Sequence, residues 1–243
     1  MTAQAPLPPP SEPPEVATAG TSFLQRPSTA RILPFAVYMA FIAVADLLER
    51  LGWSAEALRW LYPIKTAAVL AVLLAYRRYY VELVGRPLGW SSSLSAIATG
   101  VVVLVLWINL DASWMQVGAA AGFDPTMPGG RIDWFLVAIR IAGAALVVPV
   151  MEELFWRSFL LRWFEQPAFL KVYPAAVGLK SVVVTVILFG VEHNLWLAGI
   201  VAGVAYTAIY MRSGSLWAAI LAHAVTNGLL GAWVVATGSW TYW

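Results

Sequence analysis

Two adjacent glutamates and two histidines occur in long apolar stretches of this chain. Glu152 and Glu153 lie within the apolar stretch 146–164, and His193 and His223 are the only histidines among 243 residues. Inside a membrane, each ionisable side chain costs roughly 2.5–3.5 kcal/mol on insertion scales. Side chains kept there at such a cost indicate a function.

The first group of residues has the pattern Glu-Glu-x-x-x-Arg. On a helix, Glu153 and Arg157 are four residues apart and share one face, so they can form an ion pair. Glu152 lies about 100° further round the helix and is free to point elsewhere. The alternative is a helix end at the cytoplasmic surface, where this pattern would be ordinary. The apolar run continues through Leu161, which weakens that alternative.

The other two groups are Phe-x-x-x-His at residues 189–193 and His-x-x-x-Asn at residues 223–227. The spacing of four places His223 and Asn227 on one face of a helix. Each group also has an ordinary interpretation. His193 fits a hydrogen-bonded core or interfacial histidine, and the pair on the last helix fits polar side chains that join neighbouring membrane helices.

A carboxylate, two imidazoles and an amide are together sufficient for hydrolysis. The carboxylate can take a proton from water, and one imidazole can orient that water or return the proton to a leaving amine. The second imidazole and the amide of Asn227 can donate hydrogen bonds to the developing oxyanion. The candidate site therefore combines a glutamate of the pair with His193, His223 and Asn227.

The composition indicates an integral membrane protein. Hydrophobic residues make up 60% of the chain and charged residues 12%, and the mean hydropathy is +0.74. A soluble domain carries about twice that charged fraction. The net charge of +2 is too small to suggest a nucleic-acid partner. The absence of cysteine excludes disulfides and a cysteine nucleophile.

Apolar runs of near-spanning length predict an all-α, polytopic transmembrane helical bundle of about seven spans, with six to eight as the range. The bundle would occupy residues 31–243, with the catalytic half at about 140–236. The expected spans are residues 32–48, 61–75, 92–110, 141–161, 181–193, 195–211 and 216–236.

The boundaries of the fourth span decide whether the site can form. The apolar stretch 134–139 could extend this helix or lie at the membrane interface. A span over residues 141–161 places Glu152 near the middle of the bilayer, level with the two histidines. A span from Trp134 to about Val150 would leave the glutamates at the inner surface, and the site would not close.

The first 30 residues form a proline-rich tail that we expect to be disordered and cytoplasmic. With the N-terminus inside, ten of the fifteen Lys and Arg residues fall in inner segments and three in outer ones. Because cytoplasmic loops carry an excess of Lys and Arg, we expect a multi-pass membrane protein with a cytoplasmic N-terminus and an external C-terminus.

The three groups, in this order, resemble those of the CPBP family, the CAAX prenyl endopeptidases and their bacterial relatives. The segment Arg212–Trp217 is also similar to that family, and the resemblance covers about residues 140–236. It implies a helical intramembrane protease with a conical cavity in a bacterial inner membrane. Its substrate would be a membrane-associated protein or peptide in the lipid bilayer. A similarity to the bacterial CAAX prenyl protease-related group implies a link to an exosortase-type sorting system.

The resemblance also implies a role for each candidate residue. Glu152 resembles the catalytic glutamate that activates water, and His193 would be its partner. His223 and Asn227 would stabilise the oxyanion.

Glu153 and Arg157 would be supporting residues that orient the site. Family members have also been described as zinc enzymes, and Glu152, His193 and His223 would then be the zinc ligands. We favour a mechanism without a metal cofactor.

Two other classes of function compete with the protease. A non-enzymatic membrane scaffold, or an immunity or regulatory protein, can have the same fold, but the complete set of polar residues argues against a degenerate site. A transporter could use the same residues as a proton relay. Transporters commonly show internal repeats or paired broken helices, and the sequence has neither.

Overall fold

The computed structural model describes residues 22–85, 87–118 and 122–243, which form helices joined by loops. Within these residues the only strand-like pairing is one antiparallel bridge between Thr126 and Ile132, so the expected all-α fold is confirmed. The separate helices are α1 (Pro27–Arg50), α2 (Ala55–Leu58), α3 (Leu61–Ala75), α4 (Trp90–Trp107), α8 (Leu179–Val191), α9 (Trp196–Ser213) and α10 (Leu216–Thr237).

Glu152, predicted to be catalytic, and Glu153, predicted to support it, lie on one continuous helix of 30 residues, Trp134–Trp163, which we call the site helix. It consists of α5 (Trp134–Ala142), α6 (Val148–Glu153) and α7 (Leu161–Trp163), joined by π-helical turns at Gly143–Val147 and Leu154–Leu160. Asp133 caps its start, because a carboxylate oxygen accepts a hydrogen bond from the N–H of Leu136 at 3.1 Å. Single π turns inside α-helices are frequent at functional sites.

The site helix combines the two alternatives for the fourth span. It begins at Trp134, so the expected start at residue 141 was wrong and the stretch 134–139 extends the helix. It does not end near Val150, because apolar side chains beyond the glutamates, such as Leu154 and Leu161, are fully buried in the core. At 1.5 Å per residue, Glu152 lies roughly 16 Å from the end at Trp163.

Five helical segments in the described residues are long and apolar enough to cross a membrane: α1, Ala55–Ala75, α4, the site helix and α10. Helix α8 is apolar but has only 13 residues, and α9 is not among the five. All seven expected spans nevertheless coincide with helices, as a multi-pass membrane protein requires. The tail was expected to extend to residue 30, but helix α1 already begins at Pro27. Residues 1–21 of the expected tail lie outside the described residues.

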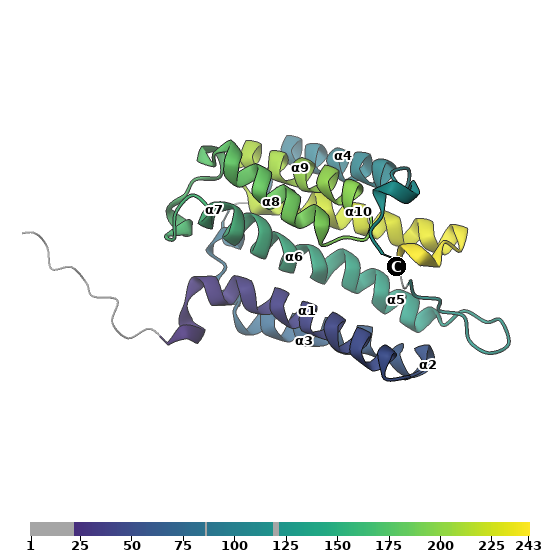
Figure 1. The fold of residues 1–243 in the computed structure, drawn as a ribbon. Coiled ribbons are helices and arrows are strands. Elements are labelled where there is room, and N and C mark those ends of the chain that lie inside the picture. The colour runs from purple at the N-terminus through teal and green to yellow at the C-terminus, as the bar shows by residue number, and fades with distance from the viewer. Residues whose placement is uncertain (1–21, 86, 119–121) are drawn as a thin grey trace, which may run out of the picture.

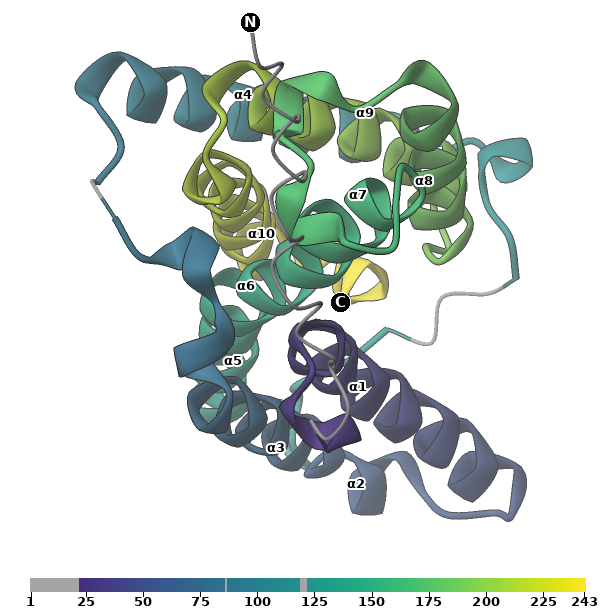
Figure 2. The same ribbon diagram turned by 90° about the vertical axis from the view of Figure 1, so that its left-hand side faces the viewer.

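The site helix runs through the middle of the molecule (Figures 1 and 2). Helices α1 and α3 pack together on one side of it, and α4, α8, α9 and α10 lie on the other. Helix α10 packs against α4, against α9 and against the site helix. The site helix therefore contributes side chains to both halves of the bundle.

A glycine allows α4 and α10 to approach closely. A Cβ atom at Gly100 would lie 2.4 Å from the carbonyl oxygen of Ala222, so a larger residue would force the helices apart. The hydroxyl of Thr226 donates to the Gly100 carbonyl at 2.9 Å and accepts from the Tyr206 hydroxyl at 2.8 Å. This contact fixes the rotation of α10, which carries His223 and Asn227.

A buried network of charges connects α1 to the site helix. Glu82 accepts hydrogen bonds from Arg31, from Arg162 at 2.6 Å and from the hydroxyl of Ser158. Burial alone would raise the pKa of the Glu82 carboxyl, but the Arg31 guanidinium and the hydrogen bonds hold it below its ordinary value. Arg31 is completely buried and also donates to Ser158 at 2.7 Å. The first half of the chain is thus joined to the end of the site helix by paired charges.

Candidate active site

All four predicted catalytic residues line one cavity of about 290 Å³. Glu152 comes from the site helix, His193 from the connection between α8 and α9, and His223 and Asn227 from α10. The fold therefore brings together residues that are up to 75 positions apart in the sequence.

Glu152 is the carboxylate of the cavity. Its side chain is buried, and its Oε2 atom has no hydrogen-bond partner among the residues that the structure describes. A carboxylate oxygen that is not engaged by the protein can accept a proton from a bound water molecule.

Its neighbour Glu153 is engaged with two side chains. The Oε1 atom of Glu153 accepts a hydrogen bond from Nδ1 of His223 at 2.9 Å and from Arg157 at 3.2 Å. The pair of Glu153 and Arg157 expected from the spacing is thus present, and both side chains are buried. Arg157 also donates to the carbonyl of Gly203 at 3.3 Å on α9.

The hydrogen bond to Glu153 determines which ring nitrogen of His223 is free to contact a substrate. Because the carboxylate only accepts, Nδ1 carries a hydrogen and Nε2 is left available. The ring is held from the side by Tyr206, which stacks on it with centroids 4.8 Å apart and an interplanar angle of 19°. Glu153 and Tyr206 together fix the orientation of the imidazole.

His193 lies in a turn and not on a helix, so the expected end of the fifth span at this residue was wrong. Helix α8 ends at Val191 and α9 begins at Trp196, and the short connection must reverse the chain direction between them. Nδ1 of His193 lies 2.7 Å from the carbonyl oxygen of Phe189 and donates to it, because a carbonyl only accepts. Nε2 of the neutral ring is therefore an acceptor. The Trp107 ring packs against the imidazole in a T-shaped arrangement, with the ring centroids 5.3 Å apart.

Asn227 is held by a carbonyl that the helix itself leaves free. In the first π turn the N–H of Val148 bonds to the carbonyl of Gly143, five residues earlier. The next donor in that pattern would be residue 149, which is proline and has no N–H. The carbonyl of Ala144 instead accepts from Nδ2 of Asn227 at 2.9 Å, and the second hydrogen of that amide stays available.

The described residues do not form a zinc site. Among them, no three His, Asp or Glu side chains are grouped closely enough to hold a metal ion. The alternative ligand set of Glu152, His193 and His223 therefore does not fit zinc in this arrangement. The absence of a cofactor stays a prediction.

Several residues of the cavity wall were not anticipated from the sequence. Tyr38 on α1, Tyr62 on α3 and Trp107 on α4 come from the first half of the chain, which shows no motif, and Arg140 comes from the start of the site helix. Arg140 carried a signal, since it is a charged residue in an apolar stretch. The aromatic residues carried none, because tyrosine and tryptophan are common at the ends of membrane helices.

The family model described as "Type II CAAX prenyl endopeptidase Rce1-like" matches residues 134–229. This range begins at the first residue of the site helix and includes Glu152, His193, His223 and Asn227. Comparison of the chain with curated proteins and with solved structures gives no match.

Proposed function

Residues 134–229 form an Rce1-like domain of the CAAX protease-like CPBP family, and on this premise we propose that the protein is an intramembrane endopeptidase. It hydrolyses a peptide bond of a membrane-associated protein or peptide, with water activated by Glu152. The observation that carries the proposal is the shared cavity, in which Glu152 lies with His193, His223 and Asn227; its Oε2 atom has no partner in the described part of the chain.

The first step is attack by water. Glu152 takes a proton from a water molecule, whose oxygen forms a bond to the carbonyl carbon of the substrate. His193 assists as a hydrogen-bond acceptor, because its Nε2 atom has a free lone pair while Nδ1 donates to Phe189. One acceptor on each side of the water fixes the direction of its oxygen.

The carbonyl oxygen becomes negatively charged in this step. The free hydrogen of the Asn227 amide donates to it, and a protonated His223 donates from Nε2. The carboxylate of Glu153 lies 2.9 Å from the other ring nitrogen and holds the imidazole in place for this contact. The proton held by Glu152 then passes to the amide nitrogen, the oxyanion re-forms the carbonyl as the carbon–nitrogen bond breaks, and a carboxylic acid and an amine leave.

The test compares membrane-protein termini in cells that express the wild type or Glu152→Gln, which keeps the shape of the side chain and removes the base. New N- or C-termini found only with the wild type support proteolysis and identify the substrate. If the termini are identical, and Glu152→Gln still supports the cellular role of the wild type, the proposal is wrong. The non-enzymatic scaffold then becomes the better explanation.

A further inference from the structure

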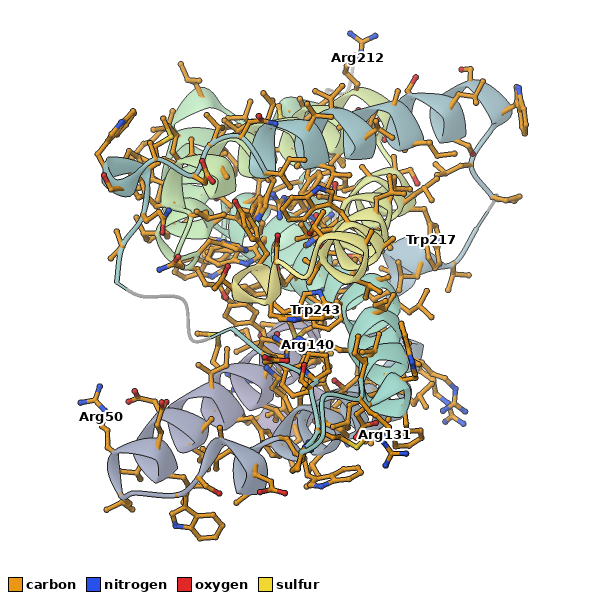
Figure 3. All side chains as sticks on the ribbon, turned by 90° about the vertical axis from the view of Figure 1, so that its right-hand side faces the viewer. Arg50, Arg131, Arg140, Arg212, Trp217 and Trp243 are labelled. Atoms are coloured by element: carbon orange, nitrogen blue, oxygen red, sulfur yellow. The ribbon has the colours of Figure 1, made fainter. Side chains whose placement is uncertain are left out.

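The cavity contains a cation that the proposed mechanism does not use. Arg140 lines the cavity together with the catalytic residues and is surrounded by aromatic rings. Its guanidinium carbon lies 4.6 Å from the ring centroid of Tyr62, 4.9 Å from that of Phe123 and 5.7 Å from that of Trp243. Figure 3 shows Arg140 beside Trp243 inside the molecule, whereas Arg131 and Arg212 extend away from it.

Among the residues that the structure describes, Arg140 has no anionic partner. The ion pairs found among residues 22–85, 87–118 and 122–243 involve other arginines, and Arg140 donates no side-chain hydrogen bond there. Aromatic faces attract a guanidinium, but they leave its N–H groups without acceptors. An unpaired arginine within a membrane-spanning segment is costly, which indicates a ligand.

A second cation adjoins the first. Lys65 Nζ lies 3.8 Å from the ring centroid of Tyr38 and 5.1 Å from that of Tyr62, the ring that Arg140 also contacts. Within the described residues Lys65 likewise forms no ion pair. Two cations that share one tyrosine make the surroundings of Arg140 attractive to an anion.

Glu152 does not neutralise Arg140, although both line the same cavity. The two residues are twelve positions apart on the continuous site helix, which corresponds to roughly 18 Å along its axis. The cavity therefore has a carboxylate at the reacting end and a guanidinium at the other.

We propose that Arg140, with Lys65 beside it, binds a carboxylate of the substrate peptide, either the C-terminal carboxylate or an Asp or Glu side chain. A guanidinium can bind a carboxylate with two parallel hydrogen bonds, which fixes position as well as charge. An extended peptide rises ~3.4 Å per residue, so the roughly 18 Å between Arg140 and Glu152 along the site helix corresponds to about five peptide residues. Because both side chains extend from the helix, a peptide that contacts both can be shorter than this. This inference rests on the proposed peptidase function and assigns it a substrate class: peptides with a carboxylate a few residues from the cleaved bond.

A peptide fits this position better than an anionic lipid headgroup. Arg140 lies on the wall of the cavity that holds Glu152. A ligand that reaches from one charge to the other must be extended, as a peptide is.

The test measures binding separately from cleavage. The full chain carrying Glu152→Gln is placed in nanodiscs of neutral phosphatidylcholine and exposed to a pool of apolar, photo-crosslinking peptides. Each peptide is present with a free or amidated C-terminus, and with Asp or Asn at one internal position. Captured peptides are quantified by mass spectrometry. We expect carboxylate forms to be captured about tenfold more than their amide forms, as for a hydrogen bond to a charged group.

Arg140→Gln in the same background should abolish this preference, and Arg140→Lys should keep part of it. The matched control is Arg131→Gln, which removes an exposed arginine outside the cavity and should change nothing. Size-exclusion profiles and thermal unfolding establish that each variant is folded. Equal capture of carboxylate and amide forms, or a preference that survives Arg140→Gln, overturns the proposal.

The pairs of peptides in the pool distinguish a C-terminal carboxylate from a side-chain carboxylate. Dependence on the free terminus assigns the C-terminal carboxylate, and dependence on Asp assigns a side chain. If Arg140→Gln lowers the amount of bound phosphatidylglycerol but not the capture of peptides, the site binds lipid and the peptide proposal is wrong. Cleavage of the pool by the wild type, absent with Glu152→Gln, tests the peptidase function on its own.

Discussion

The Oε1 atom of Glu153 accepts a hydrogen bond from Nδ1 of His223 at 2.9 Å, while the adjacent Glu152 has a buried oxygen without a partner in the described chain. Two neighbouring residues of the same type thus have different environments. Oε1 of Glu153 is paired with His223 and Arg157, whereas Glu152 lines the cavity and forms no such pair with a described residue. This contrast assigns support to Glu153 and proton transfer to Glu152 in the proposed mechanism.

The two glutamates should respond oppositely to replacement by glutamine. Glu152→Gln removes the base and should lower the cleavage rate by about a hundred- to ten-thousand-fold. It should not lower the melting temperature, because the lost carboxylate oxygen forms no hydrogen bond with a described residue. Cleavage of an identified substrate and thermal unfolding, measured on the same preparation, check both statements.

Glu153→Gln should instead destabilise the fold. It leaves Arg157 buried without a counter-charge, and breaking one partner of a buried ion pair costs about 3–5 kcal/mol. The measurement is thermal unfolding in detergent beside Glu152→Gln as the matched variant. Equal melting temperatures for the two variants would contradict the different roles.

We expect Pro149 to affect the cleavage rate indirectly, because it leaves the carbonyl of Ala144 free to orient Asn227. Pro149→Ala supplies an N–H that can bond to the carbonyl of Ala144, which now accepts from Asn227 at 2.9 Å. Because proline inside a helix is unfavourable, the variant should be as stable as the wild type or more so. Its cleavage rate should nevertheless fall, since the Asn227 amide loses the contact that orients it.

Asn227→Ala is the reference for that experiment. If Asn227 acts through the oxyanion, its removal should cost about a hundredfold or more in cleavage rate, and Pro149→Ala should lie between this variant and the wild type. A Pro149→Ala enzyme with unchanged activity would show that the carbonyl of Ala144 does not position the amide.

Glu82 should make the stability of the protein depend on acid pH. Burial raises the pKa of this carboxyl, but Arg31 and the hydrogen bonds outweigh burial, so the pKa in the folded state is below its ordinary value of 4.5. A carboxyl with a lowered pKa contributes stability above its unfolded pKa and loses it as the pH falls through the folded pKa. The melting temperature should therefore fall below about pH 4.5.

The matched variant is Glu82→Gln, whose melting temperature should be lower at pH 7 and should depend less on pH in the acid range. The expected loss comes from Arg31 and Arg162, which the carboxylate pairs in the wild type. If the wild type and the variant have parallel pH profiles, Glu82 is not the group responsible.

The helices, and one ion pair between residues of the same helix, could be predicted from the sequence. The pair of Glu153 and Arg157 follows from helical geometry alone and is confirmed at 3.2 Å. The contact between Glu153 and His223 was not foreseen, because the residues are 70 positions apart and their meeting depends on how α10 is rotated against the site helix. That rotation is determined by packing, such as the approach at Gly100, and not by local pattern.

The end of the helix before His193 was predicted two residues too late for a related reason. Glu192, His193 and Asn194 interrupt the apolar residues between α8 and α9, but no proline or glycine in this connection marks where α8 ends. The role of small residues in this turn became clear only from the structure. Gly190 and Gly199 are in close contact, since a Cβ at Gly199 would lie 3.0 Å from Cα of Gly190, and the tight connection between the helices depends on that contact.

The orientation in the membrane remains a prediction that the chain makes easy to test, because it contains no cysteine. Lys171 and Arg131 are both exposed, and the distribution of positive charge places them on opposite sides, Lys171 inside and Arg131 outside. In intact cells, a membrane-impermeant maleimide should label Arg131→Cys but not Lys171→Cys, and lysis should make both reactive. The reverse pattern would invert the topology.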